Sequence, residues 1–150
     1  MTTPIYPCLW YNGNAREAAD FYCKVFPNST MIADNGMVVL FELNGRRYMG
    51  LNGGPEFKFN ESVSFVVECA TQEEIDYYWN MLTANGGKES MCGWLKDKFG
   101  LSWQIVPAIL SELMSDPEKA PKAMKAFMSM KKFDIAALVA AVEQPKATNI

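Results

Sequence analysis

Residues 14–26, NAREAADFYCKVF, and residues 71–82, TQEEIDYYWNML, are the stretches that decide the fold. Asn14 and Thr71 favour a helix N-cap, and each is followed three positions later by a glutamate, which is the capping-box pattern. Apolar residues then recur at helical spacing, so both stretches are predicted to form helices with one buried face. The tripeptide Asp20-Phe21-Tyr22 returns as Asp76-Tyr77-Tyr78, so the second stretch repeats the first.

The offset that carries Asp20 onto Asp76 also relates the predicted strands around the two helices. It carries residues 7–12 onto 63–68, residues 37–43 onto 93–99, and residues 47–52 onto 103–108. Two copies at one long period indicate a duplicated strand–helix–strand–strand–strand unit. The fold class is therefore predicted as α+β, with module one at about residues 5–54 and module two at about 61–107.

A helical extension is predicted over residues 108–143, after the second module. Asp116-Pro117-Glu118 combines an N-cap, a proline at the first helical position and an acidic first turn. Asp134 is predicted to cap a last helix. Met114, Met124, Met128 and Met130 give this extension an apolar surface, which either forms a homodimer interface or covers the sheet of the same chain. We expect the homodimer.

The composition excludes several classes of protein. The 150 residues are 49% hydrophobic, enough for one domain with a sizeable core. A formal charge of −3 argues against nucleic-acid binding, which needs a basic surface. No apolar run approaches the roughly 18 residues of a membrane span, and no signal peptide is recognisable, so we expect a cytoplasmic protein.

Cysteine and histidine usage restricts the chemistry further. The four cysteines contain no Cys-x-x-Cys pair, and we expect them to be free thiols. Histidine is absent, which excludes Ser-His-Asp and Cys-His catalysis and the commonest metal ligand.

Side-chain alternation gives each predicted strand an apolar face and a mixed face. Gln104 shares the mixed face of its strand with Ser102 and Val106, and so does not interrupt a core. The mixed faces are either exposed to solvent or form a concave pocket with a few polar groups. On the other strands the mixed-face residues are Ser62, Ser64, Val66, Glu68, Tyr48, Gly50 and Asn52.

Three stretches resemble one known family: YNGNAREAADFYCKVF, FNESVSFVVECATQEEIDYYW and CGWLKDKFGLSWQIVP. They are similar to the PhnB-like family, often labelled demethylubiquinone 3-methyltransferase-like. It belongs to the vicinal oxygen chelate superfamily with glyoxalase I, bleomycin-resistance proteins and extradiol dioxygenases. The resemblance implies that residues 1–150 form one glyoxalase-like domain, in which paired βαβββ modules build a curled mixed sheet around a cleft.

In metal-using members of that superfamily, four ligands come from the first and fourth strands of each module. The resemblance puts those positions at Ser62, at Gln104, and near Pro7 and Gly50 of this chain. Serine, proline and glycine are poor ligands, and one amide oxygen is weak, so we expect no stoichiometric metal and no cofactor. Weak magnesium or manganese binding through Glu61 and Gln104 stays open.

Three functions remain open, of which binding of a small hydrophobic or aromatic molecule in the cleft is expected first. The second is a small-molecule enzyme of lyase, transferase or dioxygenase type, with Glu68, Glu42 or Asp97 as acid or base. The third is a structural role without a ligand. Methyl transfer from S-adenosylmethionine is not supported, because the glycine cluster at 50–55 precedes no helix signal. The predicted ligand-binding residues are Tyr11, Tyr48, Asn52, Ser62, Ser64, Glu68, Trp94 and Gln104.

Overall fold

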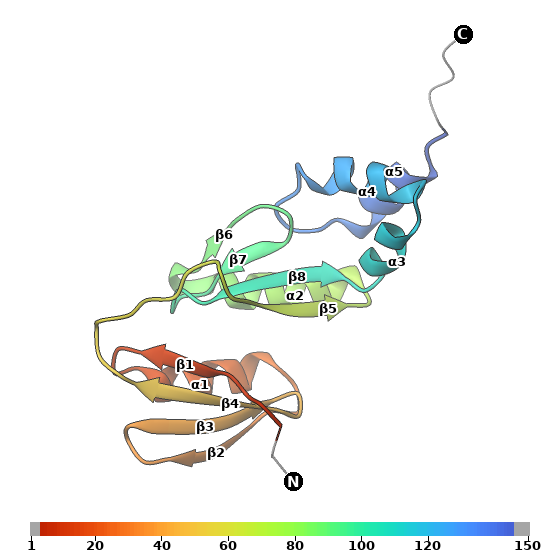
Figure 1. Cartoon of the computed structure of the whole chain (residues 1–150). Helices are drawn as coiled ribbons and strands as arrows, with labels where there is room; N and C mark the ends of the chain where they lie inside the picture. The colour runs from red at the N-terminus through yellow and green to blue at the C-terminus, as the bar shows by residue number, and fades with distance from the viewer. Residues whose placement is uncertain (1–3, 146–150) are drawn as a thin grey trace. The chain divides into compact units, whose positions relative to one another are not determined.

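The chain, described over residues 4–145 by a computed structural model, divides into two compact units, Met1–Phe59 and Asn60–Ile150 (Figure 1). Each unit begins with the same series of one strand, one helix and three strands. The first unit contains β1 (Cys8–Tyr11), α1 (Ala15–Val25), β2 (Thr30–Asp34), β3 (Val38–Leu43) and β4 (Arg46–Asn52). The second contains β5 (Ser64–Cys69), α2 (Gln72–Thr83), the short 3₁₀ helix η1 (Ala84–Gly86), β6 (Lys88–Glu89), β7 (Trp94–Lys96) and β8 (Ser102–Pro107).

Both units build a four-stranded mixed sheet with the same topology. The strand orders are β1-β4-β3-β2 and β5-β8-β7-β6. In each sheet the first strand pairs with the fourth in parallel, and the remaining pairs are antiparallel. The predicted α+β fold with two βαβββ modules is therefore confirmed, and the cleft that the resemblance implies stays a prediction.

The register of the last strand differs between the modules. Val38 of β3 pairs with Leu51, whereas its counterpart in the second module, Trp94 of β7, pairs with Gln104. The second hairpin is thus three residues shorter than the first, and Leu51 corresponds to Gln104 instead of Pro107. Our constant offset was wrong for this strand. An odd shift moves every side chain to the other face of a sheet.

Asp97 holds the shorter hairpin together. Its carboxylate is buried, and Oδ1 accepts hydrogen bonds from the backbone N–H of Phe99 at 2.8 Å and of Leu101 at 3.1 Å. Oδ2 accepts from Trp103 Nε1 at 2.9 Å. These bonds fix the carboxylate inside the turn, which argues against Asp97 as an acid or base.

Helix α1 packs on the first sheet through small and aromatic side chains. Tyr22 is fully buried and stacks on Phe41 of β3, with ring centroids 6.4 Å apart. The expected cap by Asn14 was wrong, since its side chain makes no cap hydrogen bond. Asn52, at the end of β4, caps the helix instead, because its Oδ1 accepts from the backbone N–H of Ala15 at 2.9 Å.

Helix α2 covers one face of the second sheet. Ile75, Trp79 and Leu82 are its buried residues, as the apolar spacing predicted. Thr71 caps the helix by accepting from the backbone N–H of Glu74 at 3.2 Å, which confirms the predicted N-terminus. The residues of β7 and β8 that are buried on this face include Leu95, Trp103 and Ile105.

The C-terminal extension forms α3 (Leu110–Ser115), α4 (Lys119–Phe127) and α5 (Ile135–Glu143). Asp134 caps α5 as predicted, by accepting from the backbone N–H of Ala137 at 3.0 Å. Met124 and Met128 are 46% and 60% exposed, so these two methionines do not cover the sheet of their own chain. No helix within residues 4–145 is both long enough and apolar enough to cross a membrane.

The chain between α4 and α5 docks on the second module. Met130 O and Lys131 O accept backbone hydrogen bonds from Cys92 at 2.7 Å and from Gly93 at 2.8 Å. The Gln72 side chain of α2 donates to Phe133 O and accepts from Ile135 N, both at 2.8 Å. The extension is therefore fixed to the segment just before β7 and to α2 of this unit.

Candidate functional site on the open face of the second sheet

The face of the second sheet opposite α2, here called the open face, carries the predicted mixed set of side chains. The residues that share this face by register are Ser64, Val66 and Glu68 of β5, Ser102, Gln104 and Val106 of β8, and Trp94 and Lys96 of β7. Cys69, Trp103 and Ile105 are buried on the other face. The predicted assignment of faces is therefore confirmed for this module.

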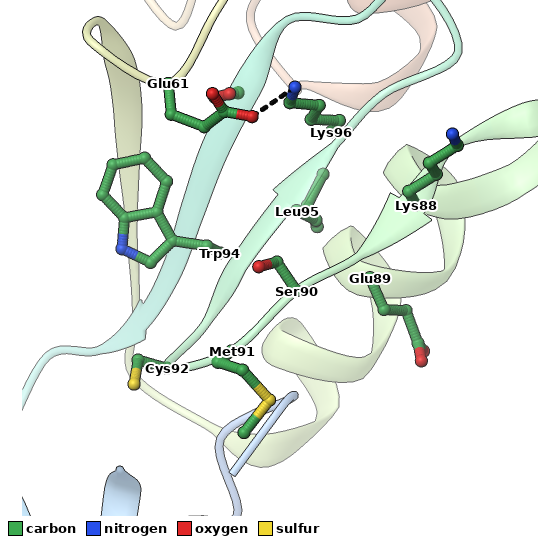
Figure 2. Close-up of a pocket in the computed structure, with 10 residues that line it drawn as sticks. Glu61, Lys88, Glu89, Ser90, Met91, Cys92, Trp94, Leu95 and Lys96 are labelled. Carbon is green, nitrogen blue, oxygen red and sulfur yellow. Dashed lines mark ion pairs between the residues drawn. The ribbon is translucent and has the colours of Figure 1, made fainter. Parts of the chain in front are cut away.

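A pocket of about 510 Å³ lies beside β6 and β7, within the second unit (Figure 2). Trp94, Leu95, Met91 and Cys92 give it an apolar wall. The remaining lining residues are Glu61, Lys88, Glu89, Ser90, Lys96 and Ser102. Apolar surface with a few convergent polar groups is typical of small-molecule sites.

Gln104 is satisfied by a neighbouring side chain on the open face. Its Nε2 donates to Ser64 Oγ at 2.9 Å, and Trp94 lies directly across the strand pair from it. The structure thus brings three predicted site residues together. Of these, Trp94 lines the pocket, and the Gln104–Ser64 bond lies on the adjoining strands.

An ion pair joins Glu61 and Lys96 at the rim of the pocket (Figure 2). The hydrogen bond from Lys96 holds the pKa of the Glu61 carboxyl below its usual value. Lys88 lies directly opposite Lys96 in the β6–β7 register. Glu89 is engaged elsewhere, since its carboxylate accepts from Trp79 Nε1 at 2.8 Å.

Ser102 presents a polar atom that the fold leaves unsatisfied. The residue is 1% exposed, and no hydrogen-bond partner for its Oγ lies among residues 4–145. A buried hydroxyl without a partner costs free energy, and such atoms in native proteins call for an explanation. Ser102 lines the pocket and pairs across the strands with Lys96.

The predicted ligand contacts of the first module, Tyr11, Tyr48 and Asn52, make structural contacts in the first unit. Tyr11 is 3% exposed, with its hydroxyl 3.5 Å from that of Tyr22. Tyr48 stacks on Phe41 with ring centroids 5.6 Å apart, and burial raises the pKa of its phenol. Asn52 caps α1 and also donates to Gly36 O at 3.0 Å. Alternation assigned Tyr48 and Asn52 to the mixed face of β4, and α1 covers that face.

The two remaining predicted residues lie away from the pocket lining. Ser62 precedes β5, and its hydroxyl is engaged with Asn60 Oδ1. Glu68 is exposed near the end of β5. The pocket residues that sequence reasoning missed are Glu61 as an ion-pair partner, Lys88, Glu89, Ser90, Met91, Cys92, Leu95, Lys96 and Ser102. Lys96 was within reach of the alternation argument, because it stands two positions after Trp94 on the same strand.

The cysteines are unpaired, as predicted. Burial raises the pKa of the Cys69 thiol to about 11, and burial raises the pKa values of Cys8 and Cys23 as well. A raised pKa lowers the thiolate fraction at neutral pH, so these three thiols are poor nucleophiles.

The residues at the expected ligand positions do not fit a divalent metal. Within residues 4–145 no group of three or more His, Cys, Asp or Glu side chains is placed to hold an ion. Glu61 is paired with Lys96, and Gln104 offers a single amide oxygen. That the protein holds no stoichiometric metal stays a prediction.

A family model described as 3-demethylubiquinone-9 3-methyltransferase matches residues 3–106. No curated protein matches the chain. A solved PhnB protein from Bacillus cereus, titled as a putative 3-demethylubiquinone-9 3-methyltransferase, is 31% identical, with a TM-score of 0.65 over 71% of this chain and 100% of its own.

Two further solved structures share the fold at low identity. A glyoxalase/bleomycin resistance protein from Albidiferax ferrireducens is 13% identical, with a TM-score of 0.53 over 71% of this chain and 98% of its own. The fosfomycin resistance protein FosX from Listeria monocytogenes is 15% identical, with a TM-score of 0.50 over 70% and 90%. The family match ends before α3, so the C-terminal helices lie outside it.

Proposed function

Because the chain belongs to the family described as 3-demethylubiquinone-9 3-methyltransferase, we propose that it binds a small aromatic or hydrophobic molecule in the pocket beside Trp94. The observation that carries this proposal is the pocket itself, which lies next to the partly buried Trp94 on the face that α2 leaves uncovered.

The size and lining of the pocket support a compact, largely apolar ligand. Its volume of about 510 Å³ falls within the roughly 300–1,000 Å³ of small-molecule sites. The Trp94 indole offers a flat surface on which an aromatic ring can stack. Met91 is flexible and polarizable, and such side chains adapt to ligands of different shape.

Binding is a better-supported role than catalysis. Two carboxylates line the pocket: Glu89 accepts from Trp79 Nε1, and the lowered pKa of Glu61 and its ion pair with Lys96 make it a weak general base near neutral pH. Methyl transfer is not part of the proposal. S-adenosylmethionine-dependent enzymes typically use a doubly wound sheet with a glycine-rich turn, whereas this chain has two small mixed sheets.

Replacing Trp94 by alanine is expected to weaken binding of aromatic ligands by about tenfold, because loss of a stacking surface costs about 1 kcal/mol or more. Ligand-detected NMR with a library of small aromatic compounds gives the affinities. Trp94→Phe keeps an aromatic ring and is expected to retain most of the binding. Hits that bind the alanine variant as well as the unaltered protein would refute the proposed site.

We also propose that the protein is a cytoplasmic homodimer. Unpaired cysteines favour a reducing compartment, and the exposed Met124 of α4 and Met128 just after it offer apolar surface for a second copy. Light scattering at micromolar concentration is expected to give about twice the 16.8 kDa of one chain. A value near the monomer mass would contradict this expectation, and Met128→Lys is expected to shift a dimer toward that value.

A further inference from the structure

We propose that the ligand of the pocket beside Trp94 carries a negative charge. It is an aromatic oxyanion, such as an arenecarboxylate, and its anionic group binds between Lys96 and Lys88. This inference rests on the proposed function and specifies the chemical class of the ligand. Three features of the pocket lead to it: the opposed lysines, the internal carboxylate of Glu61 and the unsatisfied hydroxyl of Ser102.

The two lysines concentrate positive charge at one wall of the pocket. Lys88 and Lys96 are direct cross-strand partners in the antiparallel β6–β7 pair. Like charges in this position repel each other and destabilise a sheet, unless an anion lies near them. Lys88 makes no ion pair with any residue in the described part of the chain. One of the two positive charges therefore lacks a counter-ion.

Glu61 already places a carboxylate where we infer the ligand's anion to bind. It pairs with Lys96 at the rim of the pocket (Figure 2). Both side chains are partly exposed, at 63% for Glu61 and 36% for Lys96, so the pair is hydrated and contributes little to stability. Glu61 also precedes β5, outside the sheet ladder. Its carboxylate is accordingly free to give way to an anion of the ligand.

Ser102 and Ser90 supply hydroxyl donors in the same pocket. Ser102 is the cross-strand partner of Lys96, and its Oγ is the buried atom that the fold leaves without a partner. An oxyanion bound at Lys96 would accept from this hydroxyl and remove the cost of its burial. Trp94, on the same strand as Lys96, would then stack on the aromatic body of the ligand.

The test compares 2-naphthoate with 2-naphthamide, which share one shape and differ in charge, by isothermal titration calorimetry. We expect the unaltered protein to bind the acid at least about fivefold more tightly than the amide, and added salt to reduce the difference. Lys96→Met is expected to abolish the preference. Glu61→Gln, which removes the competing carboxylate, is expected to strengthen binding of the acid about threefold and to leave the amide unchanged.

Lys125→Met serves as the matched control, because Lys125 is exposed on α4 and lies outside the pocket. It makes the same change in net charge and is expected to keep the preference for the acid. Equal binding of acid and amide would overturn this inference and leave the proposed function standing. Binding of neither would overturn both. Phenylphosphonate, tested beside benzoate, distinguishes a phosphonate site from a carboxylate site, and tight binding of either supports the oxyanion class.

Discussion

Asp97→Ala is expected to lower the free energy of unfolding by about 3–5 kcal/mol, a large part of the total stability of a small domain. The substitution removes both acceptor oxygens, and with them the bonds from the backbone N–H groups of Phe99 and Leu101 and from the indole N–H of Trp103. All three lie at or beside the turn between β7 and β8, whose ends at Asp97 and Leu101 are buried. Urea denaturation followed by far-UV circular dichroism measures the loss.

Asp116→Ala is the control for this substitution. Asp116 also accepts two backbone N–H bonds, from Glu118 at 2.9 Å and Lys119 at 3.3 Å, but it does so at an exposed helix start. Water replaces the lost acceptor there, so a loss of about 1 kcal/mol is expected. Equal stability of the two alanine variants would contradict the role of Asp97 in stabilising the β7–β8 hairpin.

Gly93→Ala is expected to cost about 3 kcal/mol or more and to release the C-terminal extension from β7. Gly93 has φ +82°, and a Cβ there would stand 2.6 Å from the Phe133 ring and 2.7 Å from Ile105 O. The left-handed conformation costs an alanine about 1–2 kcal/mol, and overpacking adds about 1–3 kcal/mol. The same substitution is expected to weaken the hydrogen bond from Gly93 N to Lys131 O. Hydrogen exchange at these amides, with urea denaturation, reports both effects.

Gly100→Ala separates strain from crowding. Gly100 has φ +89°, but no atom lies within 4 Å of the position of its Cβ. Only the conformational cost of about 1 kcal/mol is expected there. If Gly100→Ala lowers the free energy of unfolding as much as Gly93→Ala does, the contact with Phe133 is not the reason that position 93 requires glycine.

The helices and the module duplication were predictable because their signals are local. The cap by Thr71 and the apolar stripe of α2 lie within one turn or a few turns of chain, and both are present as expected. The cap of α1 was not predictable, because Asn52 reaches Ala15 from a distant part of the sequence and stands in for the nearer Asn14. A local sequence pattern does not show which of two asparagines will lie at the end of the helix in the folded chain.

The sequence predicted those parts of the candidate site that follow from side-chain alternation within one strand. Ser64 and Gln104 were placed on the mixed faces of their strands by alternation, and the structure has them on one face, with Trp94 beside Gln104. Tyr48, Gly50 and Asn52 of β4 were assigned to the mixed face by alternation, and it is this face that α1 covers. The Glu61–Lys96 pair joins the start of the second unit to β7, a contact that only the tertiary structure brings about.

The difference in length between the two hairpins also restricts how the halves of this gene can be recombined. If the two halves are exchanged at a point before the end of the third strand, equivalent positions are those separated as Val38 is from Trp94. Beyond the turn the exchange must use the shorter spacing that relates Leu51 to Gln104. In a hybrid joined within the last strand at the spacing that relates Val38 to Trp94, each side chain of that strand would move to the opposite face of the sheet. The wrong side chains would then be buried. Module grafting in this chain therefore requires whole hairpins as its units of exchange.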